Sequence, residues 1–326
     1  MFIDMHVHAY LFPGPRQDGT TQFANPAQIL SMYDAHNIEC GVLMPLIGPE
    51  FYLPQSNEEI LETCRLNPGR FIPFCNLDPR GIRNSPKTDF TPWLSWYKEH
   101  GFKGVGEFMP NLPFTHPLVM NFFRQVEAFE FPLTFDISSR IGERYGLYDD
   151  EGLPQLQTCL RSFPKLTIIG HGPAFWDEIG KLEPGDVRGS YIRHPVHGEG
   201  ALYRIFREYP NMWADLSAGS GYYALSRDPD NAAKFINEFQ DRLMYATDIC
   251  SFGKMCPMDE FLLKLRADGS ISEEVFQKVA KLNAMISKKT TWQQLLKQRQ
   301  YKPKNKVLHP SPELKHYLVS CTLVCG

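Results

Sequence analysis

Eight short apolar runs recur along this chain of 326 residues, and a stretch with helical spacing follows each of them. Several runs are apolar at consecutive positions, which is typical of parallel strands covered by helices on both faces. Eight strand–helix repeats are the number that closes a barrel. The predicted fold class is therefore α/β, a (β/α)8 TIM barrel. The predicted strands are 2–8, 40–46, 71–77, 102–108, 132–137, 166–171, 212–216 and 242–248.

Helix signals occupy the intervals between these runs. Asn25 and Pro26 supply an N-cap and a proline at the first helical position, and 56–59 (SNEE) is a capping-box pattern. Apolar residues spaced three and four apart predict the other helices. These span 91–100, 117–130, 153–163, 200–209, 229–240, 258–267 and 272–287.

The segment after residue 287 differs from the rest of the chain. Seven basic residues occur from Lys288 to Lys306 with no acidic residue until Glu313, and prolines interrupt any apolar periodicity. This composition predicts a mobile or loosely packed tail, with a basic interaction arm as the alternative. The predicted organisation is a barrel over 1–287 and a basic tail over 288–326.

Composition excludes several classes of function. A formal net charge of −3 argues against a dedicated nucleic-acid binder. No apolar stretch approaches the roughly 20 residues that cross a bilayer, and Asp4 and His6 interrupt the position of a signal peptide. The eight cysteines form no CxxC pair. We therefore expect a cytoplasmic protein with neither a membrane nor a nucleic-acid partner; a homo-oligomer is compatible with the sequence.

Polar side chains end the predicted strands, where a barrel of this kind places its substrate and cofactor. His6 and His8 are two residues apart, so a strand directs both imidazoles to one face. The alternative interpretation of such a pair is an ordinary polar face. Neutral imidazole is the commonest protein ligand of divalent transition metals. The pair therefore points to a metal site.

Five further ionisable residues end later strands, and such groups are costly inside apolar strands unless they are paired or metal-bound. Imidazole and carboxylate without thiolate suit a catalytic divalent ion, Zn²⁺ first, with Mn²⁺ or Fe²⁺ as alternatives. A nucleotide cofactor is not predicted, because the nearby glycines lack the dinucleotide spacing. The five residues are Glu107, Asp136, His171, Asp215 and Asp248.

The chain resembles the amidohydrolase superfamily, and most closely its amidohydrolase-2 branch. That branch includes aminocarboxymuconate semialdehyde decarboxylase and γ-resorcylate decarboxylase as well as hydrolases. The motifs that carry the resemblance are 4–8 (DMHVH), 170–176 (GHGPAFW) and 245–248 (YATD), within a region from residue 1 to about 287. The resemblance implies a deformed TIM barrel of the metal-dependent hydrolase type, with one metal and sometimes two.

The resemblance also implies roles for individual residues. Asp248 is expected as both metal ligand and proton shuttle, and His171 as a catalytic hydrogen-bond donor or a ligand of a second metal. Asp136 stands where these proteins usually carry a histidine ligand. Glu107 compensates for that change if it acts as a strand-four ligand; its alternative is a buried ion pair with Lys103. The expected metal ligands are His6, His8, Glu107, Asp136 and Asp248.

Other polar residues receive weaker interpretations. Asp215 is as suited to orienting a ligand histidine as to a direct role. Arg140 and Arg227 could clamp a substrate carboxylate, but a surface ion pair is favoured for both. No role is assigned to the other histidines, which are His36, His100, His116, His194, His197, His309 and His316.

The favoured function is hydrolysis of a small amide, lactone or cyclic acid by a metal-activated water, acting on a small, anionic substrate. Non-oxidative decarboxylation of an aromatic or dienoic acid is the first alternative, because it uses the same residues. A second alternative is phosphodiester cleavage, which the acidic balance disfavours. The third is a degenerate barrel without catalysis.

Overall fold

The structure is a computed structural model that describes residues 1–15, 19, 22–51 and 54–286. The predicted basic tail lies outside the described residues and stays a prediction. Within the described residues, no helix is both long and apolar enough to span a membrane.

The strands form a closed parallel ring. One sheet has the order β1-β2-β3 and the other the order β10-β9-β8-β5-β4. Parallel bridges between Cys75 and Val105 and between Val7 and Ile249 join the two sheets into a barrel. The ring strands are β1 (Phe2–Val7), β2 (Ile38–Leu43), β3 (Phe71–Pro73), β4 (Val105–Phe108), β5 (Leu133–Phe135), β8 (Ile168–Gly170), β9 (Met212–Asp215) and β10 (Leu243–Met244).

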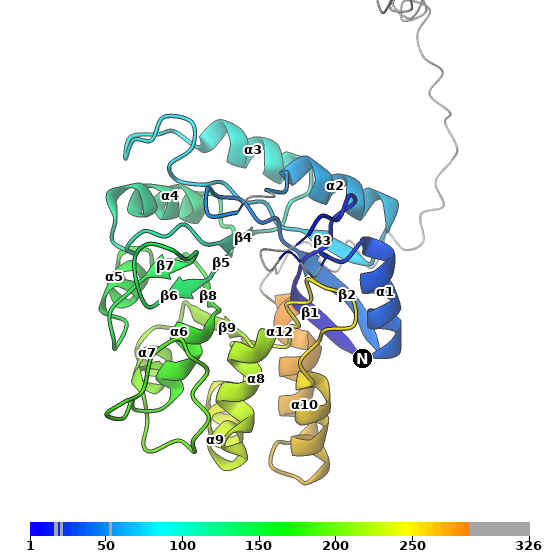
Figure 1. Ribbon diagram of the computed structural model, residues 1–326, viewed down its shortest axis with the longest axis vertical. Coiled ribbons are helices and arrows are strands. Elements are labelled where there is room, and N and C mark those ends of the chain that lie inside the picture. Colours follow the sequence, from blue (N-terminus) through cyan, green and yellow to red (C-terminus); the bar gives the residue numbers. More distant parts are fainter. Residues whose placement is uncertain (16–18, 20–21, 52–53, 287–326) are drawn as a thin grey trace, which may run out of the picture. The chain divides into compact units, whose positions relative to one another are not determined.

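Helices lie around the strands in Figure 1, as the alternating pattern predicts. The Asn25 cap has both bonds of a capping box, each 2.9 Å long. Ser56 also caps its helix, but Glu59 turns away to accept from the backbone N–H of Leu11 at 2.8 Å, so the second half of that box is missing. The surrounding helices are α1 (Pro26–Ala35), α2 (Asn57–Leu66), α3 (Thr91–Glu99), α4 (Pro117–Ala128), α5 (Pro154–Ser162), α7 (Ala201–Glu208), α9 (Pro229–Phe239) and α10 (Met258–Ala267).

Several elements depart from the predicted pattern. Most strands are shorter than the predicted runs: β4 begins three residues later than predicted, and β5, β8 and β10 end before Asp136, His171 and Asp248. The predicted helix 272–287 is divided into three parts, with a π-helical turn in the middle. The parts are α11 (Glu273–Gln277), η2 (Lys278–Leu282) and α12 (Asn283–Ile286), and the unpredicted elements are β6 (Ile137–Ser138), β7 (Leu147–Tyr148), α6 (Pro173–Trp176), η1 (Asp177–Ile179) and α8 (Ala218–Ser226).

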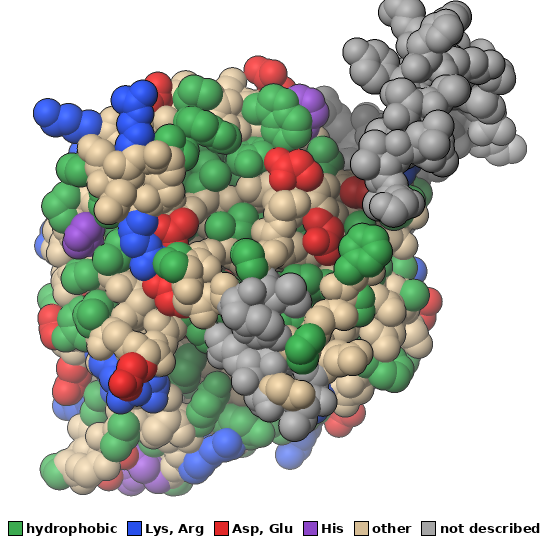
Figure 2. Space-filling model, turned by 45° about the horizontal axis from the view of Figure 1, so that its top comes forward, with side chains coloured by type: hydrophobic (Ala, Val, Ile, Leu, Met, Phe, Trp, Pro, Cys, Tyr) green, Lys and Arg blue, Asp and Glu red, His purple; other side chains and the backbone are tan. Residues whose placement is uncertain are grey.

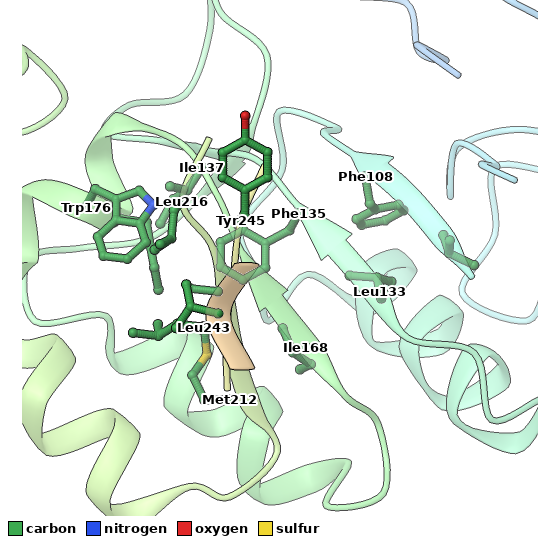
Figure 3. Close-up of a cluster of buried hydrophobic side chains, with 14 of the residues drawn as sticks. Phe108, Leu133, Phe135, Ile137, Ile168, Trp176, Met212, Leu216, Leu243 and Tyr245 are labelled. Carbon is green, nitrogen blue, oxygen red and sulfur yellow. The ribbon is translucent and has the colours of Figure 1, made fainter. Parts of the chain in front are cut away.

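Apolar side chains fill the space behind the strand ends. Figure 3 shows Ile168, Met212 and Leu243 in one cluster, and each is fully buried. They come from the neighbouring strands β8, β9 and β10. Burying a side chain of this size contributes about 1.5–3 kcal/mol. This layer gives the polar strand ends a rigid support.

A buried aspartate ties the first strand to the last. The Asp4 carboxylate accepts hydrogen bonds from the backbone N–H of His6 (3.0 Å) and from the N–H (2.9 Å) and hydroxyl (2.6 Å) of Thr247. Tyr33 donates a fourth, at 2.7 Å. Burial nevertheless raises the pKa of Asp4 to about 6. Asp4 therefore fixes the backbone of His6 relative to Thr247, the residue directly before Asp248.

Candidate metal centre

Two imidazoles face each other at the end of β1. His6 Nδ1 lies 3.0 Å from Asp215 Oδ2, and His8 Nδ1 lies 2.9 Å from the carbonyl oxygen of Met44. Both partners accept hydrogen bonds, so each Nδ1 carries the hydrogen and each neutral ring presents a lone pair at Nε2. The two Nε2 atoms are only 3.0 Å apart. Two lone pairs at that distance require a shared cation, either a proton or a metal ion.

His171 completes the imidazole group from the end of β8. Its Nδ1 donates to Asp215 Oδ1 at 3.0 Å, and its Nε2 lies 3.7 Å from Glu107 Oε1 and 3.9 Å from Asp248 Oδ2. Burial opposes the charged ring, but Asp215 and Glu107 outweigh it and raise the pKa of His171 to about 9. These carboxylates therefore favour the charged form of His171, in which Nε2 can donate toward Glu107 and Asp248.

Asp215 orients two of these rings at once. Its carboxylate accepts from His6 and His171, and also from the Ser217 hydroxyl at 2.6 Å. The indole N–H of Trp176 donates to the Asp215 carbonyl oxygen at 3.1 Å, which fixes the end of β9. Burial disfavours the charge, but these imidazoles hold the pKa of Asp215 well below its usual range. The orienting role proposed from sequence is thus supported by direct contacts.

Two carboxylates surround the facing nitrogens. Glu107 Oε2 lies 3.4 Å from His6 Nε2 and 3.3 Å from His8 Nε2. Asp248 Oδ1 lies 3.8 Å and 3.3 Å from the same two atoms. Ligands bonded at about 2.0–2.2 Å to a tetrahedral ion lie about 3.3–3.6 Å from one another. The five separations among these atoms run from 3.0 to 3.8 Å, close to that range, and His6, His8 and Asp248 form one group of possible metal donors with Glu107 beside them.

The backbone of Asp248 turns its side chain back toward β1. Its φ of 52° lies in the left-handed region, and its N–H donates to the His6 carbonyl oxygen at 2.8 Å. Aspartate adopts this region more readily than most residues. Its side chain is 22% exposed, against 6% or less for Glu107, His6, His8 and His171. Asp248 is thus the member of this group most open to exchange protons.

Asp136 lies in a different grouping from the two β1 histidines. Its carboxylate joins Glu107 and His171, whereas Asp248 joins His6 and His8. A Cβ at Gly172, where φ is +99°, would lie 2.6 Å from Asp136 Oδ1, so only glycine permits this approach. Burial and the nearby Glu107 raise the pKa of Asp136 well above its usual range. Asp136 is therefore suited to sharing a proton with Glu107.

The donor set as a whole fits a divalent cation. Burial disfavours charge on His6, but Glu107 and Asp215 reverse this and raise its pKa well above its usual value. The centre thus attracts positive charge despite its burial. Imidazole nitrogens and carboxylate oxygens without a thiolate are the donors typical of catalytic zinc.

A cavity of about 670 Å³ opens onto Asp136. Sites of roughly 300–1,000 Å³ are typical of small-molecule pockets. Glu50 on its wall is neutralised by Arg80, at 2.7 and 2.8 Å, whereas Arg144 forms no ion pair within the described part of the chain. Its other lining side chains include Ser138, Ser139, Glu143, Tyr145 and Tyr191.

The structure tests the ion pairs that the sequence suggested for three basic residues. The Lys103–Glu107 ion pair is wrong, because Glu107 pairs with His6, His8 and His171. Arg140 forms the expected surface ion pair, with Glu143 at 3.2 Å. Arg227 does not: it is half-buried, and its Nε and Nη1 have no hydrogen-bond partner in the described residues.

The sequence interpretation missed residues that come from loops. Arg144, Tyr145 and Tyr191 reach the cavity from segments without apolar periodicity, so no pattern marks them. Asp4 carried a signal that went unused. It is two residues before His6, a spacing that a regular strand would place on the same face, although β1 is irregular between Asp4 and Val7.

Comparisons with known proteins agree with this architecture. Residues 3–285 match the sequence profile of the family described as Amidohydrolase. No curated protein sequence matches the chain. An uncharacterised TIM-barrel protein from Bordetella bronchiseptica is similar in structure, with a TM-score of 0.57, 16% identity, and coverage of 91% of this chain and 98% of that one.

Two further solved structures have named activities. The 2,6-dihydroxybenzoate decarboxylase from Rhizobium has a TM-score of 0.53 and 18% identity, with 88% of this chain and 98% of that one covered. A probable 2-pyrone-4,6-dicarboxylic acid hydrolase from Acinetobacter baumannii has a TM-score of 0.51 and 14% identity, with 87% and 98% covered. At these identities the likeness confirms the predicted barrel fold.

Proposed function

The chain belongs to the amidohydrolase family, and we propose that it is a metal-dependent hydrolase of a small amide, lactone or cyclic acid. The family includes both hydrolases and decarboxylases. The observation that carries the proposal is the convergence of His6 and His8 Nε2, 3.0 Å apart, with Glu107 and Asp248 around them. Structural ion pairing alone gives no reason for two imidazole lone pairs to face each other.

His6, His8, Glu107 and Asp248 would hold the ion, and Zn²⁺ suits them best, with Mn²⁺ or Fe²⁺ as alternatives. When bound, a divalent ion supplies Lewis acidity and lowers the pKa of a coordinated water toward about 7. Asp136 was predicted from sequence as a further ligand. With Glu107 and His171 it forms a second group of possible metal donors, which is compatible with that role.

The chain's own groups would move the protons. Asp248, the most exposed of the cluster, would accept a proton from the attacking water and return it to the leaving group. His171 is held charged by Asp215, so its Nε2–H would donate to the oxygen of the substrate carbonyl. Asp215 would keep both His6 and His171 in the required orientation.

Arg144 supports an anionic substrate. It lines the cavity and lacks an ion-pair partner among the described residues, whereas Glu50 and Glu143 on the same wall each pair with an arginine. A substrate carboxylate would provide the missing partner, since guanidinium binds carboxylates through paired hydrogen bonds. Replacing Arg144 with methionine should therefore raise KM for a carboxylated substrate more than it lowers kcat.

Decarboxylation is the second candidate, and one observation favours it. Asp136 lies on the cavity wall, and burial and Glu107 raise its pKa well above its usual range, which favours the protonated form. A neutral carboxylic acid in that position could protonate the ring or chain carbon that loses CO₂.

Product analysis separates the two reactions. Metal-replete protein would be assayed against matched panels of amides, lactones and aromatic or dienoic carboxylic acids. Hydrolysis predicts ring-opened or cleaved products without CO₂, lost in the Asp248→Asn variant. Stoichiometric CO₂ from a carboxylated substrate would overturn the hydrolase assignment in favour of decarboxylation. Inactivity of the metal-replete protein on both panels would favour the degenerate barrel.

We also propose a cytoplasmic location and no nucleic-acid partner. Figure 2 shows Lys and Arg side chains interspersed with Asp and Glu on the face that it presents. Mixed charge of this kind does not resemble the basic stripe of a nucleic-acid binder. Salt-dependent binding of the protein to DNA would contradict this part of the proposal and support phosphodiester cleavage.

A further inference from the structure

A second group of possible metal donors lies outside the barrel, on the loop between η1 and α7. The base of this loop is closed by a bridge between Gly180 and Glu199 and by a 3.0 Å bond from Gly200 N–H to the Ile179 carbonyl oxygen. Two histidines and two carboxylates meet just beyond that base. They come from both limbs of the loop: Glu183 and Asp186 from the outgoing limb, His194 and His197 from the returning one.

The tautomer of His194 follows from its neighbours. Its Nδ1 lies 2.9 Å from the carbonyl oxygen of Pro195, which only accepts, so Nδ1 carries the hydrogen. In the neutral ring Nε2 then presents a lone pair. Both carboxylate oxygens of Asp186 lie opposite it, at 3.0 and 3.2 Å. A lone pair facing a carboxylate requires a cation between them, either a proton or a metal ion.

Two more donors favour the metal ion over the proton. His197 Nε2 lies 3.9 Å from Glu183 Oε1, and the donor atoms of Glu183, His194 and His197 all lie within 4.8 Å of one another. A proton bridges only one pair, whereas an ion at about 2.0–2.2 Å from each donor would engage all of them after small side-chain rotations. All four side chains are partly exposed, so an ion can enter from solvent.

We propose that Glu183, His194 and His197, with Asp186 beside His194, form a second divalent-metal site. Two imidazoles with carboxylates are the donor set of Zn²⁺. The bound ion joins the two limbs of the loop at its base. It would be weaker than the buried centre, because solvent competes for exposed ligands.

The loop that carries the proposed site also forms part of the cavity wall. Gly189 and Tyr191, at the far end of the same loop, line the cavity that opens onto Asp136. Asp177 holds that end by accepting from the N–H groups of Gly189 (2.7 Å) and Ile192 (3.2 Å). An ion at the base would restrain the loop between two fixed points and so hold Tyr191 against the substrate.

Zinc titration of variants tests the site independently of the barrel centre. Metal-free His6→Ala/His8→Ala protein would be titrated with Zn²⁺ by calorimetry, with the Hε1 resonances of His194 and His197 followed by NMR. We expect one equivalent to bind and both resonances to shift. Adding His194→Gln and His197→Gln should abolish this binding, whereas adding His100→Gln, an exposed histidine elsewhere, should not.

Wild-type protein gives a second measurement if the first variant does not fold. It should bind two equivalents, and the His194→Gln/His197→Gln variant one. Equal stoichiometry in these two proteins, or zinc binding that leaves the His194 and His197 resonances unmoved, would overturn the loop site. A wild-type protein that binds one equivalent and loses it only with His194 and His197 would support the loop site while contradicting the barrel centre.

Discussion

The same strands carry two opposite environments within a few residues. On β5 the fully buried Phe135 is followed directly by Asp136, and on β8 Ile168 is followed three residues later by His171. The first residue of each pair packs in the apolar layer of Figure 3. The second lies in the polar layer at the carboxyl ends of the strands.

The two layers differ in what stabilises them. Apolar burial is favourable in itself, so the apolar layer needs only shape and hydrophobicity. Buried charges are destabilising unless other charges compensate them, so the polar layer needs a cation to be satisfied. Side chains that reduce stability yet converge on one point indicate a site kept for chemistry.

The largest expected effect comes from the polar layer. Asp248→Asn keeps the shape of the side chain but removes its capacity to take a proton, so kcat should fall by about 10²–10⁴-fold. The melting temperature should change little. Asp34→Asn, which alters an exposed carboxylate, is the matched control. Full activity in the Asp248 variant would remove the proposed proton shuttle.

The apolar layer should respond in stability instead. Ile168→Ala should lower the free energy of unfolding by about 2–5 kcal/mol, and Ile168→Val by about 0.5–1.5 kcal/mol. Denaturant unfolding measures both changes, while metal content and activity per folded molecule should stay constant. If the valine variant lost its metal without losing stability, the assignment of stability to the apolar layer and of metal binding to the polar layer would be wrong.

A smaller effect is expected on metal affinity when Asp215, which orients the imidazoles of the polar layer, is changed. Asp215→Asn should weaken metal binding by about 10–100-fold, because His6 loses the charged acceptor on Nδ1. Ser217→Ala, which removes a hydroxyl from the same carboxylate, should have a lesser effect. Competition with a chelating dye measures both affinities. An unchanged affinity in Asp215→Asn would show that Asp215 is not needed to orient the ligands.

The smallest effect concerns a buried carboxyl outside the centre. Burial raises the pKa of Glu178 to about 7, although Arg188 lies 3.2 Å away. The folded state therefore holds this proton more tightly than the unfolded state. Its contribution to stability is complete below about pH 4.5 and is lost as pH rises to about 7, amounting to roughly 1–3 kcal/mol. Glu178→Gln should flatten this pH dependence of unfolding, and an unchanged pH profile would contradict it.

The sequence predicted the barrel because apolar periodicity reports the packing of regular strands and helices. It also predicted the residues that end those strands and converge in the structure, which are His6, His8, Glu107, Asp136, His171 and Asp248. It failed for α8, whose sequence AGSGYYALS has glycine and serine where helix formers are expected. Cavity residues such as Arg144 and Tyr191 are brought in by loops, whose paths depend on tertiary contacts.

The sequence also did not predict which ionisable side chains lie against one another. Spacing placed Lys103 and Glu107 on one face of a strand, but the Glu107 carboxylate lies 3.3–3.4 Å from the Nε2 atoms of His6 and His8 instead. His194 and His197 received no role because neither ends a strand. Their meeting with Glu183 and Asp186 depends on how the loop closes at Gly180 and Glu199.

Anomalous diffraction at the zinc edge, on crystals grown with zinc, tests the central claim most directly. The account predicts a peak about 2.0–2.2 Å from the Nε2 atoms of His6 and His8 and from carboxylate oxygens of Glu107 and Asp248. A zinc-replete crystal in which those four side chains contact no ion would contradict it.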